Sequence, residues 1–195
     1  MTDTDRQPPA MLEAAYQAAV SAPSDINEHL ALLRELAAKC DHVTEFGMRG
    51  GVSTLALLAA QPKELISWDL NPYAVVSQRA ADLLSVAGRT YFQPRVGDTR
   101  AIAVIEPTDL LFIDTLHTAR QLQAELARHA DPVRGTVRRY LVFHDTATFG
   151  MVGEDGSTPG LRAAIREFQK YVSFPLWQLH TDRQNCNGLV VLEHV

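Results

Sequence analysis

Five short apolar runs, each with the length and composition of a β-strand, alternate along this chain with segments of helical periodicity. They cover residues 42–46, 64–70, 90–96, 109–114 and 139–145. The run 109–114 is almost continuously apolar and is expected to be covered on both faces. A helix is expected from residue 73 to about 87, and a short helical segment between residue 99 and Pro107. Strands that alternate with helices predict a doubly wound α/β fold, in which helices cover both faces of a mostly parallel sheet. Two more strand-like runs, at 176–181 and 188–194, flank the polar turn 182–187 and predict a C-terminal antiparallel hairpin. The expected sheet therefore has seven strands.

An acidic residue stands at or just beyond the end of each of the first five runs. These residues are Glu45, Asp69, Asp98, Asp114 and Asp145. In doubly wound sheets, ligands bind at the carboxyl ends of the strands, so the five acidic side chains are expected along one edge of the sheet. The sequence thus predicts a ligand site lined by carboxylates.

Length and composition exclude several classes of protein. The chain has 195 residues, a formal net charge of −5 and scattered lysines and arginines, so the basic stripe of a nucleic-acid binder is missing. No apolar run approaches the ~20 residues that span a bilayer, and no membrane partner is expected. Cys40 and Cys186 show neither zinc nor disulfide spacing, and the N-terminus lacks the pattern of a secretory signal. We expect a cytoplasmic protein.

The first strand is preceded by two expected helices in residues 1–40, which would form a cap or lid within the same domain as residues 41–195. Residues 1–9 resemble a disordered leader, and the first helix begins at Ala10. The second helix is expected to be capped by Ser24 or Asp25. Its apolar face is expected to comprise Ile26, Leu30, Leu33, Leu36 and Ala37. These leading helices could pad the sheet, close over a ligand or form dimer contacts, so a homo-oligomer is compatible with the sequence.

The turn after the first strand, VTEFGMRGGVST at residues 43–54, has the composition of a ligand-binding loop. Glycines let the backbone approach a ligand closely, and the following helix offers unpaired N–H groups to an anionic group. The dinucleotide fingerprint GxGxxG fails because Arg49 stands at the second glycine position, and the phosphate loop fails because no lysine precedes Ser53. The spacing that remains is ExGxxxGxS, formed by Glu45, Gly47, Gly51 and Ser53.

Together with the Gly–Asp pair after the third run and the acids that end the others, this spacing resembles the class I S-adenosylmethionine-dependent methyltransferases. The resemblance covers about residues 41–150. It is nearest to the small metal-dependent O-methyltransferases of the catechol, macrolide-sugar or rhamnosyl type. It implies a Rossmann-like methyltransferase fold and S-adenosylmethionine as cofactor. The implied reaction is metal-assisted O-methylation of a small hydroxylated molecule, such as a sugar or a phenolic natural product.

The resemblance also implies roles for single residues in the cofactor site. Glu45, Gly47 and Gly51 would lie beneath the methionine part of the cofactor, with Ser53 near its carboxylate. Asp69 would accept hydrogen bonds from the ribose hydroxyls, since a carboxylate offers two acceptor oxygens to a diol; the alternative for Asp69 is a helix cap. Asp98 and Thr99 would lie beside the adenine, with Tyr73 near the same ring, and Asp114 would border the cofactor.

Asp114 and Asp145 are expected on adjacent strand ends, where two carboxylates can hold Mg²⁺ or a similar divalent ion. A substrate hydroxyl bound to such an ion has a lowered pKa and a fixed orientation toward the methyl group. His117 occupies the place of a basic residue in the catechol-type relatives and is the expected catalytic base. The alternatives are that it begins the next helix near Thr118 or supports the site without contacting the substrate. The alternative is that the aspartates form caps or ion pairs without a metal.

The sequence departs from these relatives beside the second aspartate. Thr146 stands where catechol-type enzymes have an asparagine ligand, and His144 stands where the sugar-modifying relatives tend to have an acid. We include His144 with Asp114 and Asp145 in the candidate metal set. Imidazole shifts the preference from Mg²⁺ toward Mn, Fe, Ni or Zn, so the identity of the metal is left open. The alternative is that His144 supports the site without binding an ion.

Two other functions on this fold also stay open. One is the reaction of the cephalosporin hydroxylase-like proteins, and the other is that of a cofactor-binding protein without catalysis. The loop at residues 149–160 follows the fifth run, where a substrate would approach, and is expected to be a lid or a tolerated insertion. Its Glu154 and Asp155 would disfavour an acidic substrate.

Overall fold

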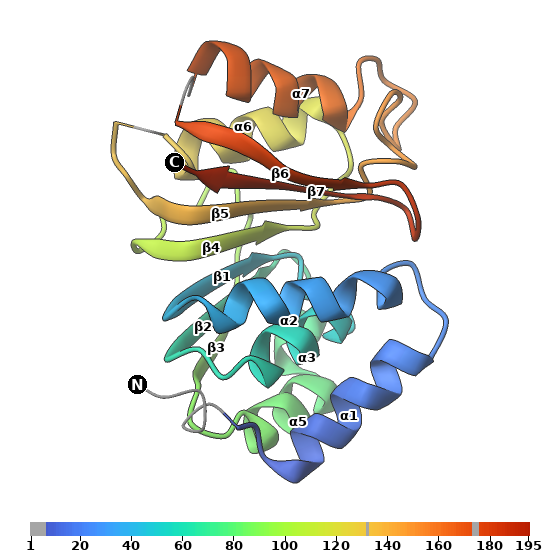
Figure 1. Ribbon diagram of the computed structural model, residues 1–195, viewed down its shortest axis with the longest axis vertical. Coiled ribbons are helices and arrows are strands. Elements are labelled where there is room, and N and C mark those ends of the chain that lie inside the picture. Colours follow the sequence, from blue (N-terminus) through green and yellow to red (C-terminus); the bar gives the residue numbers. More distant parts are fainter. Residues whose placement is uncertain (1–6, 132, 173–175) are drawn as a thin grey trace. The chain divides into compact units, whose positions relative to one another are not determined.

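The computed structural model describes residues 7–131, 133–172 and 176–195. The chain divides into two compact units, residues 1–98 and residues 99–195, which are described separately (Figure 1). Residues 1–6 of the expected leader lie outside the described residues, and residues 7–9 have no regular secondary structure. The expected division into residues 1–40 and 41–195 stays a prediction.

The first unit contains a parallel three-stranded sheet and the helices that cover it. Its strands are β1 (His42–Phe46), β2 (Glu64–Asp69) and β3 (Tyr91–Val96). They lie in the order β3-β2-β1. Helix α3 (Val52–Ala59) follows β1. Helices α1 (Ala10–Ser21) and α2 (Leu30–Ala38) both contact α3 (Figure 1). The two leading helices therefore pad this unit.

The second leading helix begins with a short 3₁₀ turn, η2 (Asn27–His29). Ser24 Oγ accepts a hydrogen bond from the amide of Asn27 at 3.0 Å, whereas the carboxylate of Asp25 pairs with Arg49 at 2.8 Å. Neither expected residue is the N-cap: Ile26 precedes the 3₁₀ turn and His29 precedes α2, and neither of these makes a side-chain cap hydrogen bond. All five residues of the expected apolar face are buried: Ile26, Leu30, Leu33, Leu36 and Ala37.

The single helix expected from residue 73 to 87 is wrong, because two helices occupy this segment. They are α4 (Pro72–Val76) and α5 (Gln78–Val86). Between them the backbone of Ser77 is extended, and its hydroxyl accepts a hydrogen bond from the amide of Ala80 at 3.2 Å. A serine side chain that caps a new helix competes with continuation of the preceding one.

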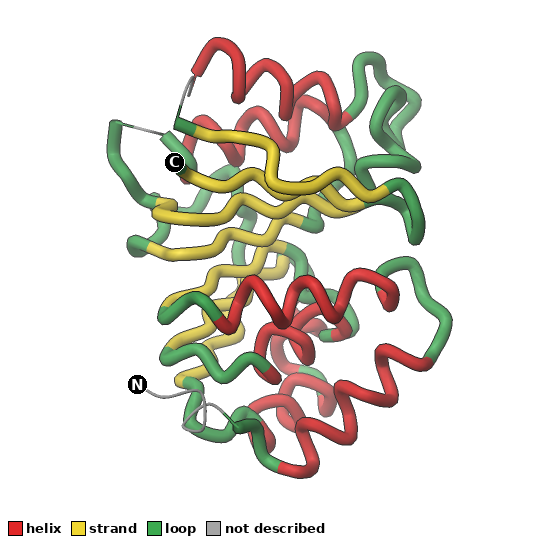
Figure 2. The backbone as a smooth tube through the Cα atoms, viewed as in Figure 1, coloured by secondary structure: helices red, strands yellow, loops and turns green. Residues whose placement is uncertain are grey.

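The second unit contains four strands with mixed pairing. They are β4 (Thr108–Ile113), β5 (Val137–His144), β6 (Trp177–Arg183) and β7 (Leu189–His194). Strands β4 and β5 are parallel, and β7 is antiparallel to both β5 and β6, which confirms the expected C-terminal hairpin. Helix α6 (Ala119–His129) and helix α7 (Leu161–Glu167), which a π-helical turn η3 (Phe168–Val172) extends, lie on one side of these strands (Figures 1 and 2).

The segment that joins β3 to β4 contains no helix at residues 99–107, all of which are described, although a short one was expected. Side chains of α6 hold this segment instead. Nε2 of His129 donates to the carbonyl of Thr99 at 2.6 Å, and the amide of Ile105 donates to Nδ1 of the same ring at 3.4 Å. These tertiary contacts outweigh the local helical tendency.

Strand β4 was expected to be covered on both faces, and the structure confirms this. Leu110, Leu111 and Phe112 are all fully buried. Such burial of consecutive residues is typical of the central strands of a parallel sheet. Among the described residues, none of the helices combines the length and the hydropathy needed to cross a bilayer.

Candidate functional site

The glycine turn after β1 contains three residues with positive φ angles, namely Gly47 (91°), Arg49 (42°) and Gly51 (72°). Gly51 immediately precedes α3, and a Cβ atom there would lie 2.6 Å from Cδ1 of Leu83. Position 51 therefore requires glycine for both its conformation and its close packing. By contrast, a Cβ atom at Gly50 would meet open space.

Asp69, at the end of β2, joins the glycine turn to the following loop. Its Oδ2 accepts a hydrogen bond from the amide of Arg49 at 2.7 Å, and its Oδ1 accepts one from the amide of Asn71 at 2.7 Å. The helix-cap alternative for Asp69 is wrong, because Asn71 caps α4 by accepting from the amide of Tyr73 at 3.0 Å. Each oxygen of the half-buried Asp69 carboxylate has a second lone pair for a ligand.

Glu45, at the end of β1, lies fully buried beneath the same turn. Its carboxylate accepts hydrogen bonds from Ser53 Oγ at 2.6 Å, Thr54 Oγ1 at 2.8 Å and Ser67 Oγ at 2.5 Å. Ser53 is buried too, and its hydroxyl points to Glu45. Glu45 and Ser53, both expected to contact the cofactor, thus contact each other. Their hydrogen bond fixes the first turn of α3.

The expected adenine residues belong to different units, Tyr73 and Asp98 to the first and Thr99 to the second. Asp98 ends the first unit and is half-buried, and the side chain of Tyr73 is largely exposed. In the second unit, Thr99 is buried and its hydroxyl donates to Oε1 of Glu125 at 2.5 Å. Glu125 itself is fully buried, and no sequence signal marked it as part of this region.

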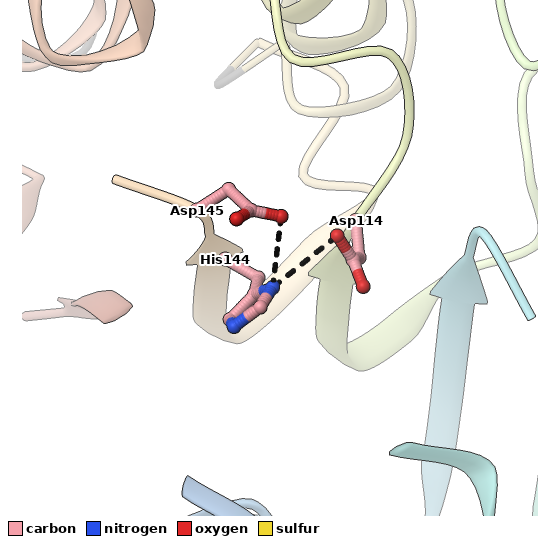
Figure 3. A group of neighbouring side chains, drawn as sticks. All are labelled: Asp114, His144 and Asp145. Carbon is pink, nitrogen blue, oxygen red and sulfur yellow. Dashed lines mark hydrogen bonds and ion pairs between the residues drawn. The ribbon is translucent and has the colours of Figure 1, made fainter. Parts of the chain in front are cut away.

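The second unit brings together the expected metal residues. Asp114 directly follows β4, while His144 ends β5 and Asp145 comes after it. Because β4 and β5 are parallel neighbours, their carboxyl ends meet, and one donor atom from each of the three residues lies within 4.8 Å of the others (Figure 3). Nδ1 of His144 lies 3.1 Å from Oδ2 of Asp145 and 3.4 Å from Oδ1 of Asp114.

His117 approaches the same two carboxylates. Its Nε2 lies 2.9 Å from Oδ2 of Asp145 and 3.2 Å from Oδ1 of Asp114. Its ring stacks on that of Phe149, with centroids 4.9 Å apart and an interplanar angle of 1°. The structure therefore joins the expected base to the expected metal residues in a single cluster.

The outer nitrogen of each imidazole also has a partner. Nδ1 of His117 forms an ion pair with Glu154, and the amide of Glu154 donates to the carbonyl of His117 at 3.1 Å. Nε2 of His144 lies 3.3 Å from the carbonyl oxygen of Cys186. The loop at residues 149–160 thus contacts the cluster through Phe149 and Glu154.

Burial and ion pairing act in opposite directions on the pKa values of the cluster. Burial opposes ionisation of Asp114 and Asp145, but hydrogen bonds and charge from the two histidines outweigh it and lower the pKa of both carboxyls. Burial also opposes charge on His117 and His144, yet the two aspartates raise the pKa of each imidazole to about 10. Without a cation, the cluster therefore pairs two imidazolium ions with two carboxylates near neutral pH.

Two further observations test whether a divalent metal fits this cluster. Oδ1 of Asp145 is buried and has no hydrogen-bond partner among the described residues, which is costly for a carboxylate oxygen. The φ angle of Asp145 is 58°, an uncommon conformation that is often found at functional sites. Carboxylate oxygens and imidazole nitrogens are ligands for divalent ions. The residues present fit such an ion.

The sequence of this chain matches a known protein family. A family model described as a methyltransferase domain matches residues 44–146, which is more than half of the chain. The chain belongs to this methyltransferase family. The resemblance to class I methyltransferases is thereby confirmed, while the catechol, macrolide-sugar or rhamnosyl type stays a prediction. No curated protein matches the sequence.

Solved methyltransferase structures share the fold at low sequence identity. The O-methyltransferase from Bacillus cereus, in complex with SAH, is 15% identical, with coverage of 96% of this chain and 91% of that one and a TM-score of 0.67. The SAH-bound methyltransferase PaMTH1 from Podospora anserina is 14% identical, with coverage of 96% and 88% and a TM-score of 0.62. The N-methyltransferase NodS from Bradyrhizobium japonicum, in complex with S-adenosyl-L-homocysteine (SAH), is 16% identical, with coverage of 94% and 98% and a TM-score of 0.61. These likenesses confirm the Rossmann-like methyltransferase fold.

The site of this methyltransferase includes residues that the sequence did not reveal. Thr54 and Ser67 hold Glu45, and no motif marks them. Phe149 and Glu154 belong to the loop expected near the acceptor, but the sequence did not reveal that both contact His117. Cys186 contributes its backbone carbonyl, which residue type cannot reveal.

Proposed function

We propose that this methyltransferase transfers a methyl group from S-adenosylmethionine to a hydroxyl group of a small molecule, with the help of a divalent metal. The observation that carries the proposal is the cluster of Asp114, His144 and Asp145 at two adjacent strand ends of a methyltransferase chain. A sugar or a phenolic natural product is the proposed class of acceptor.

The first unit would bind the methyl donor. The glycine turn would lie against the methionine part, and its conformation is held by contacts with Glu45 and Asp69. Asp69 would accept hydrogen bonds from the ribose hydroxyls through its remaining lone pairs. Asp98 and Thr99 are the proposed adenine neighbours. The SAH complexes of the Bacillus cereus and Bradyrhizobium japonicum proteins support this cofactor class.

The second unit would bind the metal and the acceptor. Asp114, His144 and Asp145 would hold the ion, which, when bound, would lower the pKa of a coordinated hydroxyl group. In the transfer, the acceptor oxygen forms a bond to the methyl carbon as the carbon–sulfur bond breaks. The sulfur leaves as the neutral thioether of SAH, and the hydroxyl proton passes to a base or to water.

His117 was expected to be that base, and this role stays a prediction. Its Nε2, however, faces both carboxylates at 2.9 Å and 3.2 Å, and its Nδ1 faces Glu154. A nitrogen that binds a metal through its lone pair cannot accept a proton at the same time. The base role and a ligand role for Nε2 therefore exclude each other, and metal-binding measurements can distinguish them.

The cofactor assignment is tested by calorimetry with SAH. Wild-type protein is expected to bind SAH, and Asp69→Ala is expected to lose most of the affinity because the ribose acceptors are gone. Asp82→Ala is the matched control, since this exposed α5 carboxylate contacts Gln78 and lies outside the proposed site. Undiminished binding to Asp69→Ala would rule out the proposed ribose contact.

The two imidazoles favour a second candidate function, the cephalosporin hydroxylase-like reaction. Non-haem iron oxygenases use two histidines and a carboxylate with open coordination positions. Oxygen-dependent turnover of an acceptor without methyl transfer would favour this function. A non-catalytic role would be favoured if SAH binds while Asp114→Asn and Asp145→Asn leave every measured property unchanged.

A further inference from the structure

We propose that His117 is a metal ligand, so that Asp114, His117, His144 and Asp145 form a four-residue centre that selects a transition-metal ion over Mg²⁺. The inference deepens the proposed function, on which it rests for the role of the ion in the reaction. It reassigns His117 from base to ligand.

The spacing of the donor atoms supports this centre. Each inner nitrogen faces the same two oxygens, at 2.9 Å and 3.2 Å for His117 and at 3.1 Å and 3.4 Å for His144. Donor atoms that share one ion at about 2.0–2.2 Å are separated by about 2.9–3.4 Å in octahedral or tetrahedral geometry. The four nitrogen–oxygen separations thus lie in the range that a shared ion would require. His117 is not part of the group formed by Asp114, His144 and Asp145, whose donor atoms all lie within 4.8 Å of one another, so its ligation would draw Nε2 toward that group.

The outer contacts orient both imidazoles for ligation. A metal-bound histidine usually donates its other N–H group to a carboxylate or a backbone carbonyl. The carboxylate of Glu154 forms an ion pair with Nδ1 of His117, which has no hydrogen bond with the geometry of a donated N–H among the described residues. The carbonyl of Cys186 lies 3.3 Å from Nε2 of His144. When an ion displaces the proton from the inner nitrogen of each ring, the lone pair of that nitrogen can bind the ion. Phe149 stacks on His117 and fixes the plane of its ring.

Burial and donor type together disfavour Mg²⁺. The side chains of His144 and Asp145 are 1% and 5% exposed, and that of His117 is 19% exposed. Mg²⁺ prefers oxygen ligands and usually keeps several waters, whereas two of the four side chains of this centre offer nitrogen. Imidazole nitrogens instead suit Mn, Fe, Co, Ni or Zn. Oδ1 of Asp145, which is buried and has no hydrogen-bond partner among the described residues, is a further oxygen that could bind a cation.

The test uses full-length protein freed of metal with a chelator and titrated with Co²⁺, Zn²⁺ or Mg²⁺ in the calorimeter. Co²⁺ and Zn²⁺ are expected to bind more tightly than Mg²⁺. His117→Ala is expected to weaken Co²⁺ binding by about 10–100-fold and to change the visible absorption bands of bound Co²⁺. His117→Asp, which supplies another ligand, is expected to restore part of the affinity.

Two further variants sharpen the result. Glu154→Gln is expected to weaken Co²⁺ binding by about tenfold, because it removes the carboxylate that orients His117. His180→Ala is the control, since this imidazole faces Glu193 at 3.0 Å and lies outside the cluster. Circular dichroism verifies that each variant is folded.

The proposal is overturned if folded His117→Ala keeps the Co²⁺ affinity and spectrum of the wild type, or if Mg²⁺ binds as tightly as Co²⁺. SAH binding, measured on the same preparations, separates the two proposals. If Co²⁺ binds as expected while SAH does not, the metal centre stands and the methyltransferase function fails. If SAH binds and Co²⁺ does not, the metal centre fails alone.

Discussion

Glu45 supports the glycine turn from inside the first unit, where its carboxylate accepts three hydroxyl hydrogen bonds. Glu45→Ala takes this acceptor from three buried or nearly buried hydroxyls, and each unsatisfied group costs about 1–3 kcal/mol. We expect the free energy of unfolding, measured in urea, to fall by about 3 kcal/mol or more. Glu35→Ala removes an exposed carboxylate that pairs with Lys39, and this change should alter the free energy of unfolding by about 0.5 kcal/mol at most. Equal effects of the two variants would contradict the inward role of Glu45.

His129 makes the second unit sensitive to acid. It is fully buried, with Nε2 donating to Thr99 and Nδ1 accepting from Ile105, an arrangement that only the neutral ring allows. Burial lowers the pKa of His129. The unfolded chain, with a histidine pKa of about 6.5, therefore binds the proton first, and the stability from neutral His129 is lost as the pH falls below that value.

Stability measurements at several pH values test this expectation. Between pH 7.5 and 5.5, His129 should lower the free energy of unfolding by up to about 1.4 kcal/mol per pH unit, whereas His117 and His144, with raised pKa values, act in the opposite direction. The difference between the pH profiles of the wild type and His129→Asn isolates the contribution of His129. His129→Asn should have a lower free energy of unfolding at all pH values. That free energy should fall less steeply with falling pH than the free energy of the wild type. Parallel pH profiles for the two proteins would contradict the assignment.

At the scale of elements, α6 connects two loops through its inward face. Gln121, Glu125 and His129 are spaced by four residues on that face, and all three are buried. Glu125 accepts hydrogen bonds from Thr99 Oγ1 at 2.5 Å and from Thr115 Oγ1 at 3.0 Å. Thr115 follows Asp114 directly in the chain, so we expect the contact between Glu125 and Thr115 to hold the backbone of Asp114 in place for metal binding.

Glu125→Ala should therefore affect metal binding as well as stability. We expect about a tenfold weaker Co²⁺ affinity, by analogy with other contacts that orient metal ligands, and a loss of unfolding free energy of about 2–3 kcal/mol. Glu167→Ala, which removes an exposed partner of Gln123, is the control. A loss of stability with unchanged Co²⁺ affinity would limit Glu125 to a structural role.

Strand positions could be predicted from the sequence because apolar runs and turn residues mark them directly. The first two strands match within one residue, and β5 starts two residues before the expected run. Helices were less predictable where side chains intervene. Ser77 divides the expected helix at 73–87, and α6 holds residues 99–107 out of helical conformation. Neither contact is visible in hydrophobic periodicity.

For the whole molecule, the rule that ligands gather at strand ends predicted where Asp114 and Asp145 would meet. It could not reveal Phe149 or Glu154, because a long loop brings them to His117. Nor could it show that Glu45 and Ser53 face each other and not open space. Residue type and order predict the edge of the sheet, whereas loop conformation decides what completes the site.

Ligands should stabilise the whole chain by mass action. At 100 times its dissociation constant, a ligand adds about 2.7 kcal/mol to the unfolding free energy, which for a protein of this size raises Tm by roughly 5–10 °C. Differential scanning fluorimetry with SAH and with Co²⁺ measures both shifts. Asp69→Ala should lose the SAH shift and keep the Co²⁺ shift, because its carboxylate belongs to the proposed cofactor site alone. Loss of both shifts would show that the two sites are not separable.

The left-handed backbone of Asp145 limits what evolution or engineering can place there. At a φ angle of 58°, asparagine and glycine are the substitutes that cost least, while β-branched residues are strongly strained. A saturation library at codon 145, sorted for folded protein, should therefore return asparagine and glycine beside the native aspartate. Asparagine keeps the shape and removes the charge, so this position offers a nearly isosteric means of switching off the centre without disturbing the chain around it.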